Sequence, residues 1–273
     1  MVPMPGTGSD DRSLLELAER LARGAGELVR TARERAGDGL DADAKSTPTD
    51  LVTEVDRASE RWLVAELARE RPDDAVLGEE GTDSGGASGV RWLLDPIDGT
   101  VNFLYGLRPY AVSVAGERDG LVVAGCVHDP TSGETFTALR GQGAWLDGRR
   151  LGGGWLAADL ERAVVGTGFS YDEGRRGGQG RVLAGLLPRI ANLRRLGSAA
   201  LDLCYVAAGR LDAYYELGLN PWDLAAGGLV AVEAGAVVSG LRGRPPGEFT
   251  VAASPAVAAE FGTLLEELGA DEV

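Results

Sequence analysis

Histidine is almost absent from this chain, and its absence limits the chemistry that the chain can perform. His128 is the only histidine among 273 residues. A zinc site built from three histidines is therefore excluded. A Ser-His-Asp triad would have to use His128, and the chain has no G-x-S-x-G turn to present the serine. Any reaction that the chain supports must depend on other groups.

Cysteine and long apolar runs are also scarce. Cys126 and Cys204 are the only cysteines and lie far apart in the sequence, which favours a reducing compartment and two small, buried apolar side chains. No run is long enough to span a bilayer, and residues 1–11 lack the apolar segment of a signal peptide. We expect a cytoplasmic protein with no membrane partner, in which residues 1–12 are disordered.

Positive charge is the third shortage. The formal net charge is −15, the pI is about 4.6, and Lys45 is the only lysine among 27 Lys and Arg residues. Such a surface repels nucleic acids and anionic membranes, so no nucleic-acid partner is expected. It would also repel a phosphorylated small molecule unless a cation intervenes. An acidic chain that binds phosphate is therefore expected to recruit a metal ion.

The length and the 44% hydrophobic content suit one large domain or two packed subdomains. A Gly-rich segment at 152–154 indicates a boundary between an N-terminal α+β subdomain at 13–151 and a C-terminal α/β subdomain at 152–273. Short apolar runs separated by turns over 110–146 predict an antiparallel meander, which favours α+β layers over a doubly wound sheet. Helices are predicted at 13–35, 53–70, 181–187, 197–208, 220–234 and 255–268.

The most informative stretch is Trp92–Phe103, where an apolar run ends at Asp95 and a proline, a second acid and a glycine turn the chain. Asp95 and Asp98 lie at the mouth of a predicted buried strand, where unpaired anions are heavily penalised. They are suited to hold a hard cation such as Mg²⁺. The N–H groups of Gly99 and Thr100, at the start of a helix, would suit an anion. The alternative is a capped turn with two solvated acids.

Further acids lie at similar transitions from apolar to polar sequence. Asp56 and Asp223 fall in the first turns of predicted helices, and Glu79 follows a short strand. Each alone is equally well explained as a capping or surface acid. Together with Asp95 and Asp98 they provide carboxylates for two Mg²⁺ ions, which can clamp both oxygens of an in-line displacement at phosphorus.

Other phosphate-binding motifs are missing. The chain has no G-x-x-x-x-G-K-[ST] loop, and Gly141–Gly143 is not followed by the third glycine of a dinucleotide fingerprint. Asp95–Thr100 superficially resembles the D-x-D-G-T signature of haloacid-dehalogenase phosphatases. Its acids are three rather than two residues apart, and the only lysine lies upstream instead of downstream, so that family is rejected.

Four motifs, in the right order, resemble those of the inositol monophosphatase family. They are Lys45–Asp56, Gly78–Glu80, Asp95–Thr100 and Trp222–Gly227. Arg195–Asp202 and Ala213–Glu216 are most similar to the bacterial inositol-1-phosphatase branch. The resemblance spans about residues 13–268. It implies a layered αβαβα sandwich of the α+β class, a homodimer, and Mg²⁺-dependent, Li⁺-sensitive hydrolysis of phosphomonoesters.

The resemblance also implies roles for individual residues. Asp95 would bridge metal ions, and Asp56 would help to hold a further, weaker ion. Thr100, with Asp56 or Glu79, would orient the nucleophilic water, and the Gly99 and Thr100 amides would hold the phosphate. The implied metal ligands are Glu79, Asp95, the Ile97 carbonyl, Asp98 and Asp223. The implied substrate contacts are Gly99, Thr100, Ser198, Ala199, Glu216, Asp98 and Asp223.

Within that set, Glu216, Ser198 and Ala199 would face the inositol ring, and Asp223 would lie close to the leaving oxygen. Lys45 falls on the family's lysine near the metal site, and Thr167 is the expected ring contact from the strand end at 165–169. The chain departs from the family pattern in two places. Ala236 replaces a glycine and Gly240 replaces an aspartate. Both lie away from the implied ligands and are expected to affect packing only.

The implied reaction is hydrolysis of inositol 1-phosphate by a metal-activated water, without a phosphoenzyme. Histidinol phosphate, fructose 1,6-bisphosphate and 3′-phosphoadenosine 5′-phosphate are alternative substrates on the same fold. An interaction protein built on this fold, and a non-catalytic metal or anion binder, are alternatives from other classes. The full set of acids favours catalysis.

Overall fold

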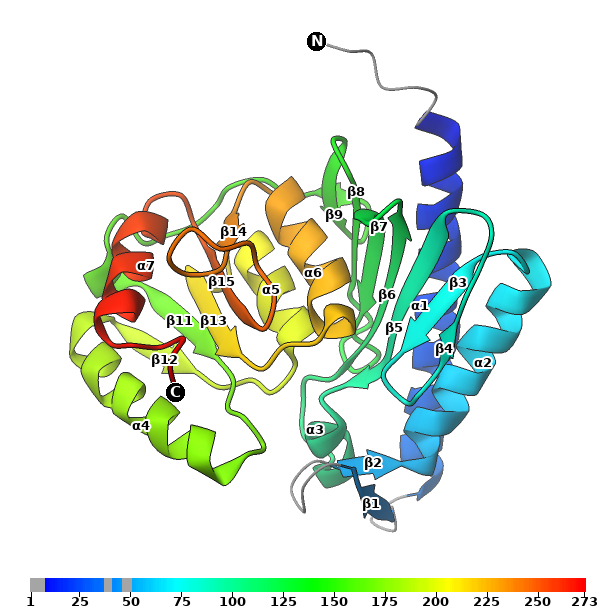
Figure 1. Ribbon diagram of the computed structural model, residues 1–273, viewed down its shortest axis with the longest axis horizontal. Helices are drawn as coiled ribbons and strands as arrows, with labels where there is room; N and C mark the ends of the chain where they lie inside the picture. The colour runs from blue at the N-terminus through cyan, green and yellow to red at the C-terminus, as the bar shows by residue number, and fades with distance from the viewer. Residues whose placement is uncertain (1–7, 37–40, 46–50) are drawn as a thin grey trace.

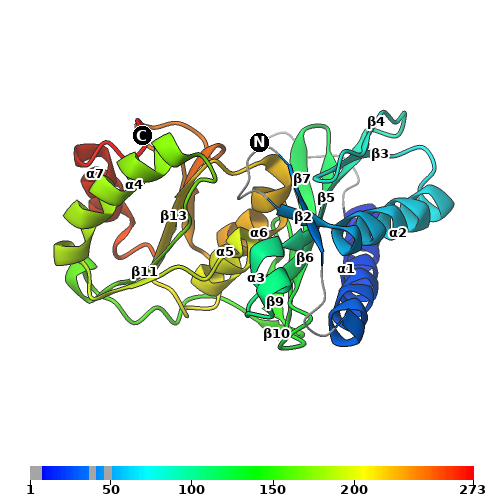
Figure 2. The same cartoon turned by 90° about the horizontal axis from the view of Figure 1, so that it is seen from below.

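Two large β-sheets and three layers of helices form the structure, a computed structural model that describes residues 8–36, 41–45 and 51–273 (Figure 1). The helices that form the layers are α1 (Gly8–Ala36), α2 (Glu54–Glu70), α4 (Glu173–Leu186), α5 (Ala199–Ala207), α6 (Pro221–Glu233) and α7 (Ala258–Glu267). α1 and α2 cover the outer face of the larger sheet, α5 and α6 lie between the sheets, and α4 and α7 cover the smaller sheet (Figure 1 and Figure 2). This order confirms the predicted αβαβα sandwich.

The larger sheet has the strand order β10-β9-β8-β7-β6-β5-β3-β4. Its strands are β3 (Ala75–Gly78), β4 (Asp83–Ser84), β5 (Val90–Asp98), β6 (Ala111–Arg118), β7 (Leu121–His128), β8 (Thr135–Leu139), β9 (Gly143–Leu146) and β10 (Arg149–Arg150). From β5 to β10 each strand pairs antiparallel with the next, which confirms the predicted meander. β3 runs parallel to β5, so both strands end at the same edge of the sheet.

Helix α1 begins earlier than the sequence pattern predicts. It starts at Gly8 rather than Ser13, so the expectation that residues 1–12 are disordered is wrong for 8–12. Asp10 and Asp11 lie in its first turn, where the helix dipole favours negative charge. Both pair with Arg118 of β6, at 2.6 and 2.9 Å, which fixes this end of the helix on the sheet.

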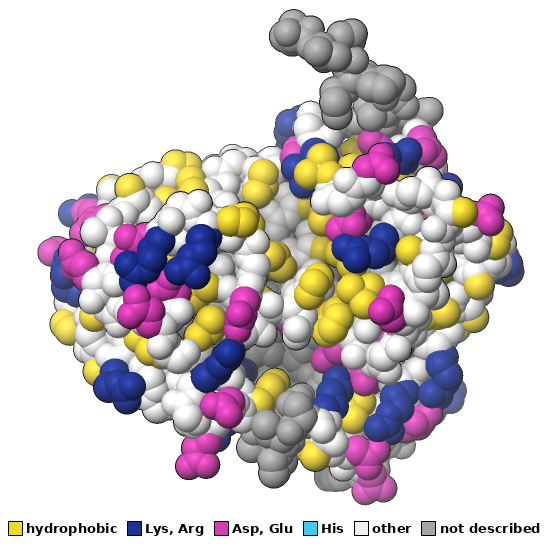
Figure 3. Space-filling model, viewed as in Figure 1, with side chains coloured by type: hydrophobic (Ala, Val, Ile, Leu, Met, Phe, Trp, Pro, Cys, Tyr) yellow, Lys and Arg dark blue, Asp and Glu magenta, His cyan; other side chains and the backbone are white. Residues whose placement is uncertain are grey.

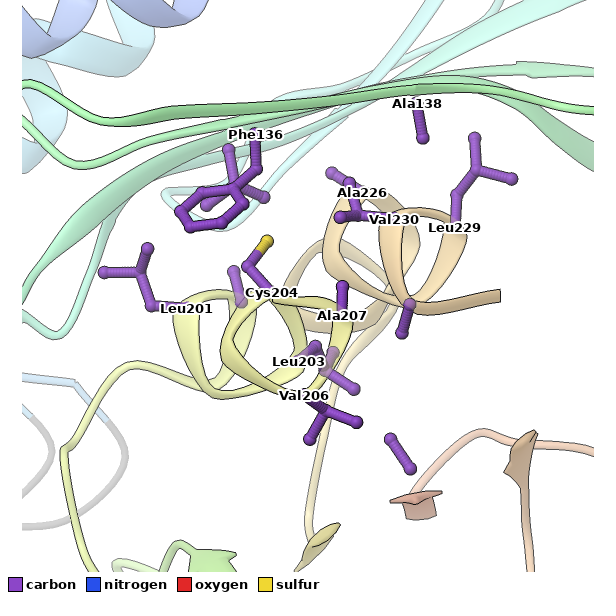
Figure 4. Close-up of a cluster of buried hydrophobic side chains, with 14 of the residues drawn as sticks. Phe136, Ala138, Leu201, Leu203, Cys204, Val206, Ala207, Ala226, Leu229 and Val230 are labelled. Atoms are coloured by element: carbon purple, nitrogen blue, oxygen red, sulfur yellow. The ribbon is translucent and has the colours of Figure 1, made fainter. Parts of the chain in front are cut away.

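The middle layer is packed closely because small residues face one another in it. A side chain at Gly125 of β7 would lie 3.0 Å from the Cα of Ala226, and one at Gly227 of α6 would lie 2.8 Å from the carbonyl oxygen of Ala200. Figure 4 shows α5 and α6 facing Phe136 and Ala138 of the larger sheet. Close contact of backbones fixes the two helices against that sheet, and therefore fixes the positions of their N-termini.

The smaller sheet has the order β12-β11-β13-β15-β14 and mixes parallel and antiparallel pairs. Its strands are β11 (Val164–Thr167), β12 (Asn192–Arg194), β13 (Ala213–Leu217), β14 (Val237–Ser239) and β15 (Phe249–Ala253). The remaining elements are β1 (Ala42–Ala44), β2 (Leu51–Thr53), α3 (Thr100–Tyr105), η1 (Leu160–Arg162) and η2 (Leu187–Arg189). The division at residues 151 and 152 stays a prediction, and it falls between β10 and β11.

Cys126 and Cys204 are both free and buried, as the sequence predicts. None of the helices in the described ranges is both long and apolar enough to cross a membrane. On the visible face in Figure 3, acidic side chains lie beside basic ones. The net charge of −15 is therefore not gathered into one acidic patch on that face.

Candidate functional site

A cavity of about 410 Å³ opens where the ends of β3 and β5 meet the N-termini of α3, α5 and α6. Most of the expected site residues line it, although they come from distant parts of the chain. They are Lys45, Glu79, Asp95, Ile97, Asp98, Gly99, Thr100, Ser198, Ala199, Glu216 and Asp223. Two expected site residues, Asp56 and Thr167, do not line the cavity. Asp56 lies behind Thr100, which does line it. Residues 46–50 of the Lys45–Asp56 motif lie outside the described residues.

Strand β5 carries both acids of the Asp95–Thr100 motif, in a conformation that the sequence does not predict. The expected turn after Asp95 is wrong, because the strand continues through Pro96 to Asp98. Its pairing register with β6 shifts between Asp95 and Asp98, which marks a bulge. A bulge tolerates proline, which has no N–H to pair. Gly99 then turns the chain into α3 with a φ of 101°, a conformation that favours glycine.

Asp95 is a buried carboxylate with little to compensate its charge. Its side chain is 1% exposed, accepts a hydrogen bond from the Ile97 N–H at 3.1 Å, and lies in hydrogen-bonding contact with the Glu79 carboxyl group. Burial, together with the negative charges of Glu79, Asp98 and Asp223, raises the pKa of Asp95 well above its ordinary value. Several acids around one buried carboxyl are costly to ionise unless a cation joins them.

Asp98 is surrounded by hydrogen-bond donors instead. It accepts from the Ser198 hydroxyl at 2.5 Å, the Ala200 N–H at 2.8 Å and the Ala199 N–H at 3.1 Å. These donors open α5, so Asp98 caps a helix that follows it by 100 residues. Burial raises the pKa of Asp98 to about 6, and the three bonds oppose that shift. Asp98 therefore joins the larger sheet to the middle layer as well as lining the cavity.

Asp56 reaches the cavity through Thr100. Thr53 and Asp56 form the capping box of α2, and Asp56 also accepts a hydrogen bond from the Thr100 hydroxyl at 2.8 Å. The same hydroxyl lies 3.1 Å from the Ile97 carbonyl oxygen. Burial raises the pKa of Asp56, which is 0% exposed, although its hydrogen bonds oppose that shift. The expected alternatives for the partner of Thr100 were Asp56 and Glu79, and the direct contact is with Asp56.

Lys45 lies between two glutamates at the end of β3. Its ammonium is 2.8 Å from Glu79 Oε1 and 2.6 Å from Glu80 Oε1. Burial lowers the pKa of Lys45, but the two carboxylates outweigh it and raise the pKa overall. Burial raises the pKa of Glu80 to about 7, against the effect of Lys45. Glu80 was part of a predicted motif but had no predicted role.

Asp223 approaches the cavity from the second half of the chain. It lies in the first turn of α6, where its carboxylate accepts from the Asn220 N–H at 2.7 Å in a capping box. The Ser113 hydroxyl of β6 donates to the Trp222 carbonyl oxygen at 3.2 Å and ties this turn to the larger sheet. Burial, then the charge of Asp98, raises the pKa of Asp223. Asp223 is both a capping acid and a cavity acid.

The carboxylates fit a hard divalent cation in their chemistry. Asp95, Asp98 and Asp223 are oxygen donors whose pKa values are raised by burial and by the charge of neighbouring carboxylates, Glu79 among them, and a cation would relieve both effects. Within the described residues, no three acidic, His or Cys side chains already converge with the spacing of a formed metal site. Lys45 instead holds one oxygen of Glu79. The donors are therefore gathered in one cavity but not arranged around one point.

The wall opposite β5 contains Glu216 and residues for which the sequence predicts no role in the site. Thr167 does not line the cavity and pairs in register with Tyr215, whose side chain packs on the face away from Glu216, so the expectation that it reaches a ring in the cavity is wrong. Gly168, the next residue, lines the cavity, because successive side-chain positions along an extended chain face opposite sides. Arg195 also lines it; this residue opens the Arg195–Asp202 motif, but no role was predicted for it.

The comparisons with known proteins agree with this geometry. A family model described as the inositol monophosphatase family matches residues 10–272. A Mycobacterium tuberculosis protein named inositol-1-monophosphatase SuhB is 46% identical over 270 residues, which cover 93% of each chain. A Pseudomonas aeruginosa protein named Nus factor SuhB is 44% identical over 236 residues, which cover 84% of this chain and 86% of that protein.

Solved structures give the same result. The crystal structure of extragenic suppressor protein suhB from Bartonella henselae matches with a TM-score of 0.86 at 33% identity, covering 96% of this chain and 100% of that chain. The fold and nearly the full length of the sequence therefore lead to one conclusion. This chain belongs to the inositol monophosphatase family, and that membership supports its assignment as a phosphatase.

Proposed function

We propose that this protein hydrolyses phosphate monoesters of small polyols, with inositol 1-phosphate as the main substrate and Mg²⁺ as the cofactor. The observation that carries the proposal is the position of Asp95. It is buried in a cavity beside Glu79, Asp98 and Asp223, and the Gly99–Thr100 turn lines the same cavity. A strongly anionic protein that binds an anionic ester at such a place needs divalent cations to do so.

The residues that would hold Mg²⁺ are Glu79, Asp95, the carbonyl of Ile97, Asp98 and Asp223, with Asp95 shared between ions. When bound, Mg²⁺ would neutralise phosphate charge and lower the pKa of a water, which removes the need for a histidine base. Lys45 would release Glu79 for this role and remain paired with Glu80. Asp56, which is fully buried, would support a further ion from behind Thr100.

Thr100 would orient the attacking water. Its hydroxyl donates to Asp56, so its lone pairs remain available to accept a hydrogen from a water in the cavity. The N–H groups of Gly99 and Thr100 would hold the phosphate oxygens at the start of α3. Packing requires glycine at this turn, because a Cβ at Gly99 would lie 2.9 Å from the Gly197 carbonyl oxygen.

The polyol would lie against the opposite wall. Glu216 is a carboxylate that can accept from ring hydroxyls, and it lines the same cavity as Ser198 and Ala199. Asp98 would contact the substrate from β5, and Asp223 would lie near the leaving oxygen. Residues that accept hydroxyl hydrogens favour a polyol phosphate over histidinol phosphate or a nucleotide. A second phosphate group on the substrate would be repelled by several carboxylates here.

The test is release of inorganic phosphate from a panel of phosphomonoesters, compared by kcat/KM with Mg²⁺ and with a chelator. We expect Mg²⁺-dependent turnover, with inositol 1-phosphate preferred over the three alternative substrates. Absence of turnover on every ester would favour the alternatives of an interaction protein or a non-catalytic binder. A preference for another ester would support the phosphatase assignment and overturn inositol 1-phosphate as the main substrate. The homodimer, Li⁺ inhibition and cytoplasmic location stay predictions.

A further inference from the structure

Two neighbouring tyrosines on β13 face opposite sides of the smaller sheet. Tyr214 lies on the same face as Glu216, because side chains in a strand alternate. The Tyr214 hydroxyl donates to Glu216 Oε2 at 2.6 Å. Tyr214 is 0% exposed and does not line the cavity, whereas Glu216 does. Tyr215 packs on the other face, in a cluster with Phe249 and Phe261.

Gly168 confines the same carboxyl group from another side. A Cβ built on Gly168 would lie 1.9 Å from Glu216 Oε2 and 2.1 Å from Oε1. The backbone of Gly168 does not have a positive φ, so its conformation does not require glycine. Glycine is required here because the Glu216 carboxyl group occupies the space that a side chain would fill.

The charges around Glu216 would not hold it in this place by themselves. Arg195 is the cation that acts on it, while three acids face it from other elements. One of these, Asp202, is 1% exposed, and its Oδ1 has no hydrogen-bond partner in the described part of the chain. The facing groups are Tyr214 of β13, Arg195 before α5, Asp98 of β5, Asp202 of α5 and Asp223 of α6.

We propose that Tyr214 is a positioning residue, which together with the bare backbone of Gly168 fixes the Glu216 carboxyl toward the cavity and so determines the preference for polyol over aryl phosphates. The inference rests on the proposed function, in which Glu216 contacts the polyol. The Tyr214 bond occupies Oε2 and leaves Oε1 to accept a substrate hydroxyl. An aryl phosphate has no such hydroxyl and would not need this group.

The experiment compares Tyr214→Phe and Gly168→Ala with matched controls that leave Glu216 untouched. Tyr215→Phe removes the neighbouring hydroxyl on the opposite face. Gly177→Ala adds a methyl group where no atom lies within 4 Å. For each variant, kcat and KM are measured in Mg²⁺ with inositol 1-phosphate and with p-nitrophenyl phosphate, together with the melting temperature.

We expect Tyr214→Phe and Gly168→Ala to raise KM for inositol 1-phosphate by about tenfold, as for loss of a hydrogen bond to a charged group. Their kcat for inositol 1-phosphate, and both kcat and KM for p-nitrophenyl phosphate, should stay near the wild-type values. Neither control should alter the ratio of the kcat/KM values for the two esters. A lower melting temperature with an unchanged ratio would overturn the inference, because it would show a structural role only.

Glu216→Gln separates this inference from the proposed function. Glu216→Leu, which removes both acceptor oxygens, serves with it as the decisive variant. If Glu216→Leu loses the preference for polyol and the Tyr214 and Gly168 variants keep it, the positioning role fails and the Glu216 contact stands. If Glu216→Leu keeps the preference, the contact itself is wrong and the inference falls with it. Absence of turnover in the wild-type protein on both esters would overturn the proposed function.

Discussion

The two sides of the cavity differ in how the negative charge of their carboxylates is compensated. On the side of the larger sheet, Asp95 is buried with one backbone donor and several acidic neighbours. On the opposite side, each acid has a defined donor: Asn220 N–H for Asp223 and the Tyr214 hydroxyl for Glu216. The first arrangement leaves charge for a cation to neutralise, and the second fixes carboxylates in place. Under the proposed function, the first side performs most of the reaction, while the second recognises the alcohol through Glu216 and supplies Asp223 as a further metal ligand.

Asp98 connects the two sides. It extends from the same strand as Asp95, but its three donors come from Ser198, Ala199 and Ala200 at the start of α5. A carboxylate that caps a helix and also lines a cavity supports both the fold and the site. Variants at these two neighbouring acids should therefore have different consequences, and this difference gives the strongest test of the comparison.

The largest effect is expected for Asp95→Asn. We expect kcat/KM for every phosphomonoester to fall by about a thousandfold, since about 4 kcal/mol of transition-state stabilisation would be lost with the cation site. The folded-state pKa of Asp95 lies above its ordinary value, so in metal-free protein its ionisation opposes folding at neutral pH. The variant should consequently melt at a higher temperature than wild type in a chelator, and gain less from Mg²⁺. A variant with normal turnover would refute the assignment.

Asp98→Asn should lose activity to a similar degree but should leave the metal-free protein less stable than Asp95→Asn does, because only Asp98 accepts the hydrogen bonds at the start of α5. An asparagine side chain would direct an NH₂ group at one of the donors that open α5, and loss of a helix cap costs about 1 kcal/mol. Thermal melting of the metal-free variant, compared with Asp95→Asn under the same conditions, measures this. Equal melting temperatures for the two variants would mean that Asp98 does not support α5.

Thr100→Val is expected to have the next largest effect. Valine keeps the shape but leaves Asp56 without the hydroxyl that donates to it, and leaves the attacking water without an acceptor. We expect kcat to fall by about a hundredfold with KM little changed, as for misplacement of a reacting group. Thr100→Ser keeps the hydroxyl and serves as the control. If the serine variant lost as much activity as the valine variant, the hydroxyl would not be the group that matters.

The parts of this architecture that local sequence specifies were predicted well. Thr53, Ser198 and Asn220 precede apolar periodic runs, and each is the cap of its helix. The bond from Ser198 to Asp98 joins residues 100 apart, and no local pattern indicates it. Thr167 was a misassignment by one position, which in an extended chain exchanges a cavity residue for a buried one. Early recognition of Gly168 would have required knowing where Glu216 lies.

The smallest effect concerns pH and the recognition side alone. Burial raises the pKa of Glu216 to about 7, so its carboxylate is mostly protonated at pH 6 and mostly ionised at pH 8. The preference for inositol 1-phosphate over p-nitrophenyl phosphate should therefore increase across this range, by less than about tenfold. Glu216→Gln should remove the increase. Because Asp95 and Lys45 would act on both esters, their titration cancels in the ratio of the two kcat/KM values. A ratio that changes equally with pH in wild type and in Glu216→Gln would assign the effect to the esters themselves.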